Sequence, residues 1–247
     1  MRRSAPAGFA FVAAGRLRML VRDGAPEVGD LLRHWAADTL PPARALPGGR
    51  GGVGAFALRP DLAAVLRPYK RGGLVAHINA ERYLGLRPRP FSELHSALML
   101  AGRGVPTPEP LGAAVLWDAP GVYRGALVTR EVWGAANLWH YLQTQPPAAR
   151  GPACVAAATA AQRLLAAGAI HPDLNLQNFL IRPTSHGVQA LIIDLDRVRT
   201  ARVTPRTRRA AFERICRSIR RLDPESAVIT LACVEAFRGV AESPESN

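Results

Sequence analysis

The amino-acid sequence predicts an α+β protein with two lobes, in which a strand-rich first half is followed by a helix-rich second half. Residues 1–132 hold short apolar runs separated by proline and glycine turns, a pattern typical of strands and loops. Residues 133–247 hold alanine-rich and amphipathic stretches with helical spacing. We therefore expect an N-terminal lobe over residues 1–132, with a glycine-rich loop, one long helix and a hinge at its end, and a helical C-terminal lobe over residues 133–247.

In the first lobe, residues 1–60 are predicted to form loops and strands, because turn formers interrupt the apolar runs. Apolar residues alternate with arginines over residues 16–22, as in a half-buried strand. Pro90 suits the first turn of a helix that ends near residue 101, just before two glycines. Further strands are expected over residues 64–67, 111–116 and 125–132.

In the second lobe, the chain is predicted to turn helical after the prolines at positions 146 and 147. Gly168 suits the position that follows a helix end. The expected elements are, in order, a helix over residues 152–167, two short strands over 179–181 and 190–193, and a basic stretch from 197 that becomes helical and continues to about 239.

Composition limits the classes of protein that fit. The chain has 247 residues and a mean hydropathy of +0.01, enough to bury a core. The chain has no run of 18 apolar residues, so a membrane-spanning helix is not predicted. Its three scattered cysteines argue against a disulfide scaffold, and we therefore expect a cytosolic protein. The net charge is +13, and 31 of the 32 basic residues are arginine. Codon bias explains the choice of arginine, but the excess of positive charge predicts an anionic partner.

The most specific motif is the segment His171-Pro172-Asp173-Leu174-Asn175-Leu176-Gln177-Asn178, followed sixteen residues later by Asp194. The spacing matches the kinase pattern HRDLxxxN and the metal-binding aspartate of DFG. In that chemistry Asp173 accepts the proton of an attacking hydroxyl. Asn178 and Asp194 supply hard oxygen ligands to Mg²⁺, which neutralises the β- and γ-phosphates of ATP.

A glycine-rich segment lies upstream. Gly49, Gly51 and Gly54 satisfy GxGxxG and precede a predicted strand, which suits a loop that covers the phosphates of ATP. A plain glycine-rich turn is the alternative.

The cation that contacts phosphate should lie on the next strand. Arg67 occupies the position of the lysine in the kinase motif VAIK, and Lys70 is the second choice. Glu93, near the start of the following helix, is the candidate to pair with Arg67. The alternative for Glu93 is a first-turn acid favoured by the helix dipole.

These segments resemble the family of small bacterial lipopolysaccharide kinases, and within it the kinases of 3-deoxy-D-manno-octulosonic acid (Kdo). The resemblance covers roughly residues 45–222. It rests on the motifs Val65-Leu66-Arg67-Pro68-Tyr69-Lys70-Arg71-Gly72-Gly73-Leu74, Arg82-Tyr83-Leu84, Phe91-Ser92-Glu93, the segment from His171 to Asn178, and Ile193-Asp194-Leu195-Asp196-Arg197.

The resemblance implies a two-lobed protein-kinase-like fold with a β-rich N-lobe and a reduced helical C-lobe. It implies ATP and Mg²⁺ as cofactors and a lipid-linked anionic sugar as acceptor, namely the 4-OH of Kdo on a Kdo-lipid A precursor. It also implies a peripheral location on the cytoplasmic face of the inner membrane.

The chain departs from the protein-kinase pattern after Asp194. Leu195 and Asp196 follow where DFG has phenylalanine and glycine, no APE motif is present, and only 53 residues remain. These departures argue against peptide substrates.

Residues 197–221 hold ten arginines and one acid, Glu213. We interpret this stretch as a contact with an anionic membrane surface or with lipid A phosphates. An ordinary surface helix packed on the lobe is the alternative.

Three alternatives to a Kdo kinase fit parts of the sequence. Another sugar kinase of this fold would act on a core heptose or an aminoglycoside-like acceptor, although a cationic acceptor would be repelled. A basic nucleic-acid-binding module needs aromatic residues among the basic ones, and residues 197–221 contain only Phe212. A catalytically dead scaffold is disfavoured by the intact Asp173, Asn178 and Asp194. We thus expect no nucleic-acid partner, and no obligate protein partner is evident.

Overall fold

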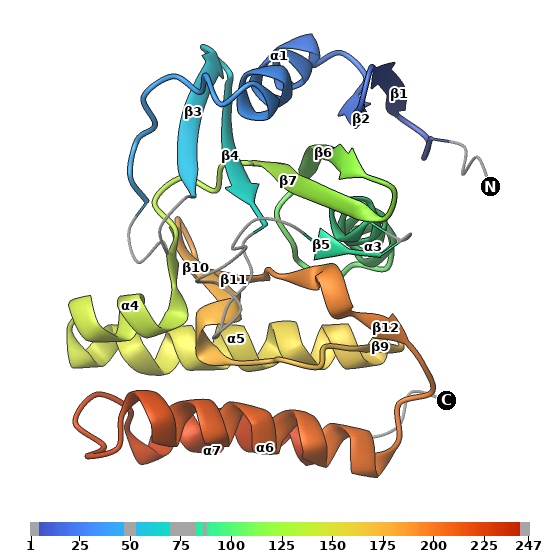
Figure 1. Ribbon diagram of the computed structural model, residues 1–247. Helices are drawn as coiled ribbons and strands as arrows, with labels where there is room; N and C mark the ends of the chain where they lie inside the picture. Colours follow the sequence, from blue (N-terminus) through green and yellow to red (C-terminus); the bar gives the residue numbers. More distant parts are fainter. Residues whose placement is uncertain (1–4, 47–52, 70–82, 86–87, 243–247) are drawn as a thin grey trace. The chain divides into compact units, whose positions relative to one another are not determined.

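The computed structural model describes residues 5–46, 53–69, 83–85 and 88–242 (Figure 1). The chain forms two compact units. The first comprises Met1–Leu46, Arg50–Leu98 and Glu109–Glu131, and the second comprises Pro47–Gly49, Met99–Pro108 and Val132–Asn247. Helices and antiparallel strands are both abundant, which confirms the predicted α+β class.

The first unit contains a seven-stranded antiparallel sheet with the order β1-β2-β6-β7-β4-β3, and β5 pairs with β7. The strands predicted around residues 17–22, 64–67, 111–116 and 125–132 are present, although the last ends at Arg130. The strand bounds are Phe9–Ala14 (β1), Leu17–Arg22 (β2), Gly54–Arg59 (β3), Leu62–Pro68 (β4), Tyr83–Leu84 (β5), Pro110–Ala119 (β6) and Val122–Arg130 (β7).

Helix α1, Pro26–Ala36, corrects the expectation that residues 1–60 form only loops and strands. Its apolar residues Val28, Leu31, Leu32 and Trp35 recur at helical spacing and are buried. The signal is short, and turn-forming residues surround it. The helix therefore depends on a sheet face to pack against, since helices of this length are marginal alone.

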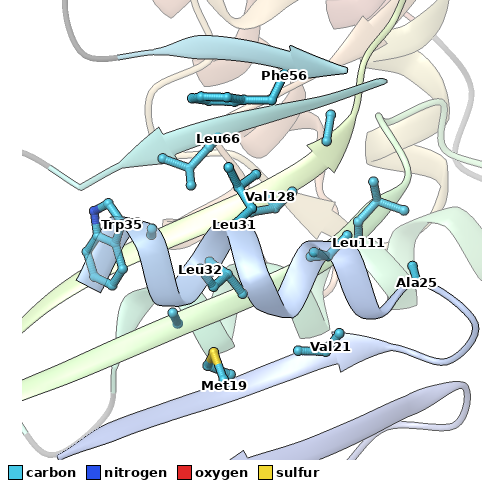
Figure 2. Packing of buried hydrophobic residues seen from close by; sticks show 14 of the residues in the cluster. Met19, Val21, Ala25, Leu31, Leu32, Trp35, Phe56, Leu66, Leu111 and Val128 are labelled. Carbon is cyan, nitrogen blue, oxygen red and sulfur yellow. The ribbon is translucent and has the colours of Figure 1, made fainter. Parts of the chain in front are cut away.

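Because side chains alternate along a strand, β4 and the residue after it contribute to two hydrophobic clusters, one on each face of the sheet. Leu62 and Leu66 lie on one face of the sheet and pack in the cluster that contains α1 (Figure 2). Tyr69, just beyond the end of β4, belongs to the second cluster, together with Leu94 of helix α3, Arg89–Gly102. Arg67 alternates with Leu66 and thus shares the face of Tyr69 and α3. The helix predicted from Pro90 is confirmed as α3, with nearly the expected ends.

The second unit is mainly helical. Its helices are Leu138–Thr144 (α4), Pro147–Ala166 (α5), Pro205–Leu222 (α6) and Leu231–Glu242 (α7). Strands β8 (Ala136–Asn137), β10 (Phe179–Thr184) and β11 (Gly187–Ile192) form one small sheet, and β9 (Ala169–Ile170) pairs with β12 (Arg199–Thr200). Two short 3₁₀ helices, Leu176–Asn178 (η1) and Leu195–Arg197 (η2), complete the unit.

Two helix boundaries in this unit differ from the sequence prediction. Helix α5 begins at Pro147 because proline fits the first helical position, so the helix starts five residues before the predicted residue 152. The predicted continuous helix to residue 239 is instead divided into α6 and α7. Asp223 caps the break, since its carboxylate accepts hydrogen bonds from the backbone N–H groups of Ala227, Val228 and Ile229.

These bonds also set the ionisation of Asp223. Burial opposes the charged carboxylate, but the three backbone N–H groups and the nearby Arg150 outweigh it and hold the pKa of Asp223 below its usual range. The charged form of Asp223 therefore stabilises the connection between α6 and α7.

The packing of α1 predicts a measurable loss of stability on truncation. Leu32 is 0% exposed within the cluster between α1 and the sheet. Leu32→Ala should lower the free energy of unfolding by about 2–5 kcal/mol, because it leaves a cavity there. Chemical denaturation followed by tryptophan fluorescence measures the change. The exposed neighbour Arg33 is the control, and Arg33→Ala should change stability by no more than about 0.5 kcal/mol. Equal effects of the two substitutions would contradict the packing of α1.

Candidate active site

The first unit joins Arg67 of β4 to Glu93 of α3. The guanidinium Nη2 of Arg67 donates a hydrogen bond to Oε2 of Glu93, whose side chain is only 3% exposed. The hydroxyl of Tyr69 donates to the same carboxylate oxygen. A buried carboxylate is costly unless it is paired, so this cluster satisfies a charge that the fold places inside the protein. The two residues that the sequence suggested as a pair are therefore in contact.

Most of the predicted glycine-rich loop lies outside the described residues, and so does Lys70. Gly54 is described and begins β3, where a Cβ atom would clash with the side chain of Ala43. Packing therefore accounts for the glycine at this position. The same segment is held by Arg44, whose backbone pairs with Ala55 and whose side chain forms an ion pair with Glu131.

In the second unit, His171 organises the loop that carries Asp173. The Nδ1 atom of His171 accepts a hydrogen bond from the backbone N–H of Asp173 over 3.2 Å. Its Nε2 atom lies 3.3 Å from the carbonyl oxygen of Ile193. Nδ1 as acceptor requires the tautomer with the proton on Nε2, which then donates to Ile193. The buried imidazole thereby links the Asp173 loop to the chain that leads into Asp194.

Asn178 is bonded to the same loop. Its side-chain Nδ2 donates to the carbonyl oxygen of Asp173 over 2.8 Å, and Nδ2 of Asn175 donates to that oxygen over 3.0 Å. Asn175 lies between Asp173 and Asn178 in the sequence, at a position to which the kinase pattern HRDLxxxN gives no role. Asn175 also accepts a bond from Gln177 N–H and so caps η1. The loop holds its own shape through short-range bonds, and the Asp173 side chain is left exposed to solvent.

Ser218 fastens this loop to helix α6. Its hydroxyl accepts a hydrogen bond from the backbone N–H of Leu176 over 3.3 Å, and the side chain is buried. The contact joins residues 42 positions apart, so no local sequence signal could have indicated it.

Asp194 follows β11 in a left-handed backbone conformation, with φ 64° and ψ 53°. Its neighbour Ile193 donates a backbone hydrogen bond to the carbonyl oxygen of Asn178 over 3.0 Å. The backbone thus brings Asp194 beside Asn178. A non-glycine residue in this region carries strain of about 1–2 kcal/mol, which proteins commonly retain at functional positions.

Asn178 and Asp194 fit a magnesium ion by their chemistry. With Nδ2 of Asn178 directed at a carbonyl, the amide oxygen is the atom left to face a cation. Mg²⁺ usually takes one or two protein oxygens and completes its shell with water and substrate phosphates. The described residues contain no cluster of three or more His, Cys, Asp or Glu that could hold a metal. A two-residue site of this kind is the one that the donors present can form.

Comparison with known proteins agrees with these features. Residues 43–237 match the model of the lipopolysaccharide kinase (Kdo/WaaP) family. This chain belongs to that family. It is 35% identical over 178 residues to a 3-deoxy-D-manno-octulosonic acid kinase of Xanthomonas oryzae pv. oryzae, covering 71% of this chain and 68% of that protein. It is 32% identical over 201 residues to the protein of the same name from Stenotrophomonas maltophilia, covering 79% and 76%.

A solved structure shares the fold. The chain matches the structure titled "WaaP in complex with acyl carrier protein" with a TM-score of 0.57 and 16% identity, covering 92% of this chain and 89% of that one. The family resemblance and the protein-kinase-like fold predicted from the sequence are thus confirmed, and the protein is a kinase. Among the described helices, none is long and apolar enough to cross a membrane.

The left-handed backbone at Asp194 predicts an order of stability among variants. Asp194→Gly should be more stable than Asp194→Ala by ~1 kcal/mol, because glycine adopts positive φ without strain and alanine does not. Chemical denaturation measures both. Asp196 lies in the same turn without positive φ, so there the alanine variant should be the more stable. The same order at both positions would refute the strain at Asp194.

Proposed function

We propose that this kinase transfers the γ-phosphoryl group of ATP to Kdo, at its 4-OH, on a Kdo-lipid A precursor. The observation that carries the phosphoryl-transfer chemistry is the hydrogen-bonded loop that joins Asp173 to Asn178 and lies beside Asp194. Support for the acceptor comes from the family and from relatives that are named kinases of this sugar.

In the proposed reaction the acceptor oxygen attacks the γ-phosphorus, the bond from that phosphorus to the β,γ-bridging oxygen breaks, and ADP leaves. Asp173, whose carboxylate is exposed, accepts the proton of the acceptor hydroxyl. Asn178 and Asp194 would hold Mg²⁺, which supplies charge neutralisation on the β- and γ-phosphates. Positioning and electrostatics supply most of the catalysis in reactions of this type.

Of the residues proposed to bind ATP, the described ones, Gly54, Arg67 and Glu93, belong to the first unit. Arg67 would contact phosphate oxygens, since a guanidinium offers several donors in one plane. Glu93 would orient Arg67 through their ion pair. The segment with Gly49, Gly51 and Gly54 would cover the phosphates, and Lys70 remains the alternative cation.

Substitutions of the loop residues test this assignment. Asp173→Ala should lower kcat by ~10²–10⁴-fold, because the general base is lost. The Asn178→Ala and Asp194→Asn variants should also lose most phosphoryl-transfer activity, and their remaining activity should need a higher Mg²⁺ concentration. The assay follows labelled phosphate from ATP to a Kdo-lipid A precursor. Asp30→Ala, which removes an exposed carboxylate on α1, is the control and should retain activity. Near-normal turnover in a folded Asp194→Asn protein would rule out its role in holding the metal.

We also propose that the enzyme acts as a peripheral protein on the cytoplasmic face of the inner membrane. The support is the distribution of charge on α6. At 100° per residue, Arg206, Arg209, Arg217 and Arg220 span about 80° of the helix circumference, and all four are exposed. Glu213 lies within the same span and forms an ion pair with Arg209, so this face carries a net positive charge rather than positive charges alone. The opposite face buries Ala211 and Ile215 against the unit. We call the four arginines the basic face of α6.

The structure refines which arginines can reach an anionic surface. Arg208 lies in the same run but is only 4% exposed, so it belongs to the packed side of α6. Phe212 and Ile219 are half-buried and Ile215 is buried, as expected for residues that face the protein. Charge, rather than insertion of apolar side chains, is thus the means of membrane contact that this helix offers.

Charge reversal tests the membrane contact. Replacing Arg206, Arg217 and Arg220 with glutamate should weaken binding to anionic vesicles and raise the apparent KM for a lipid-linked acceptor. Binding of the unmodified protein should fall with salt, because the Debye length is already only ~8 Å at 0.15 M ionic strength.

The matched control reverses three exposed arginines elsewhere, Arg33, Arg103 and Arg182, and changes the net charge equally. Co-sedimentation with anionic and neutral vesicles at two salt concentrations compares the variants. Equal losses in both triple variants would show that total charge, and not the basic face of α6, governs binding.

A further inference from the structure

Tyr69 contacts both members of the Arg67–Glu93 pair. Its hydroxyl donates to the carboxylate oxygen of Glu93 that Arg67 also binds, and it lies 3.4 Å from Nη2 of Arg67. The guanidinium carbon of Arg67 stands 5.0 Å from the centroid of the Tyr69 ring, in a cation–π contact. Tyr69 is itself 7% exposed, so its contact with Glu93 is buried, whereas the side chain of Arg67 is 31% exposed.

The spacing of Arg67 and Tyr69 along the strand explains why both side chains lie near Glu93. Positions 67 and 69 lie two residues apart at the end of β4, so both side chains are on the face that α3 covers. The backbone of Tyr69 continues the pairing of β4 with β7, because its N–H donates a hydrogen bond to the carbonyl oxygen of Gly125 over 2.8 Å. Tyr69 is therefore held by the sheet independently of its hydroxyl.

The ring of Tyr69 is also fixed by aromatic neighbours. It packs edge-to-face on Tyr83 at 6.2 Å between centroids, and Tyr83 stacks on Tyr123 at 5.8 Å. The stacking on Tyr83 needs only the ring of Tyr123, because the Tyr123 hydroxyl accepts a hydrogen bond elsewhere, from the backbone N–H of Arg89, the first residue of α3, over 3.0 Å. A ring held in this way presents its hydroxyl to Glu93 at a constant position.

An arginine at this strand position must be held in one orientation to bind phosphate, whereas a lysine need not be. A lysine ammonium is compact and can turn its three donors toward phosphate freely, whereas a guanidinium is planar and useful only in the right orientation. Contact with Glu93 fixes one edge of the Arg67 guanidinium, and the face of the Tyr69 ring restricts its tilt.

We propose that Tyr69 is a positioning residue for ATP binding, which fixes the Glu93 carboxylate and, through it, the plane of the Arg67 guanidinium. The proposal rests on the proposed function of Arg67 as the phosphate contact. Arg67 and Tyr69 together thereby do what a single lysine does in the kinase motif VAIK.

The experiment measures ATP affinity without any acceptor. Isothermal titration of the full-length protein with ATP and excess Mg²⁺ gives Kd for the unmodified chain, Tyr69→Phe, Glu93→Gln and the double variant. Tyr69→Phe keeps the ring and removes only the hydroxyl. Kd for ATP should rise about tenfold or more, the range expected for losing a hydrogen bond to a buried charge. In the Glu93→Gln background the same change should alter Kd less than about twofold, because the charge that Tyr69 holds is gone.

Tyr123→Phe is the matched control, since it removes a hydrogen-bonded hydroxyl from the same aromatic cluster without contact to Arg67 or Glu93 in the described structure. It should lower the thermal unfolding temperature and leave Kd for ATP unchanged. The proposal is overturned if Tyr69→Phe only lowers the unfolding temperature, as Tyr123→Phe does. It is also overturned if Tyr69→Phe weakens ATP binding equally with and without Glu93. Because no acceptor is present, failure to phosphorylate Kdo would reject the proposed acceptor and leave this test unaffected.

Discussion

The face of the first unit's sheet that α3 covers is organised around a buried charge, the carboxylate of Glu93. A carboxylate at 3% exposure needs strong donors, and β4 supplies them from one face through Arg67 and the adjoining Tyr69. Because side chains alternate, this commits Leu62, Ala64 and Leu66 of β4 to the opposite face. That face would be exposed apolar surface without a cover, and α1 provides the cover. The ion pair on one face and the helix on the other are thus two consequences of a single strand register.

In the second unit, the loop from His171 to Asn178 is stabilised mostly by hydrogen bonds within itself. One carbonyl oxygen, that of Asp173, accepts from both Asn175 and Asn178, and His171 connects the loop to Ile193. These bonds fix the backbone and leave the side chain of Asp173 exposed to solvent. The strained conformation at Asp194 is tolerated because its neighbour is tied to Asn178. An ordered backbone and an exposed Asp173 side chain are therefore combined within this loop.

Features with local causes were predictable from the sequence, and features with distant causes were not. Strand β4, helix α3 and the hairpin of β10 and β11 follow from proline placement and apolar patterns within each segment. The α+β class was likewise predictable, and the kinase spacing of Asp173 and Asn178 placed together two residues that are hydrogen-bonded in the structure. Helix α1 was missed because its stability comes from a sheet built later in the chain. The break between α6 and α7 was missed because Asp223 binds backbone four to six residues ahead.

The distribution of positive charge could likewise be predicted only in part from the sequence. The net charge of +13 follows from the composition alone. Which arginines present their charge to solvent depends on the fold. Arg67 is committed to a buried carboxylate, and Arg208 is enclosed within α6 packing. An amphipathic helix in an arginine-rich chain acquires an arginine-rich outer face simply because its inner face must be apolar. What distinguishes α6 is that Glu213 is the one acid in the helix, so its outer face carries an excess that codon bias cannot produce. Helix geometry and the scarcity of acids, rather than the number of arginines, determine the local density of positive charge.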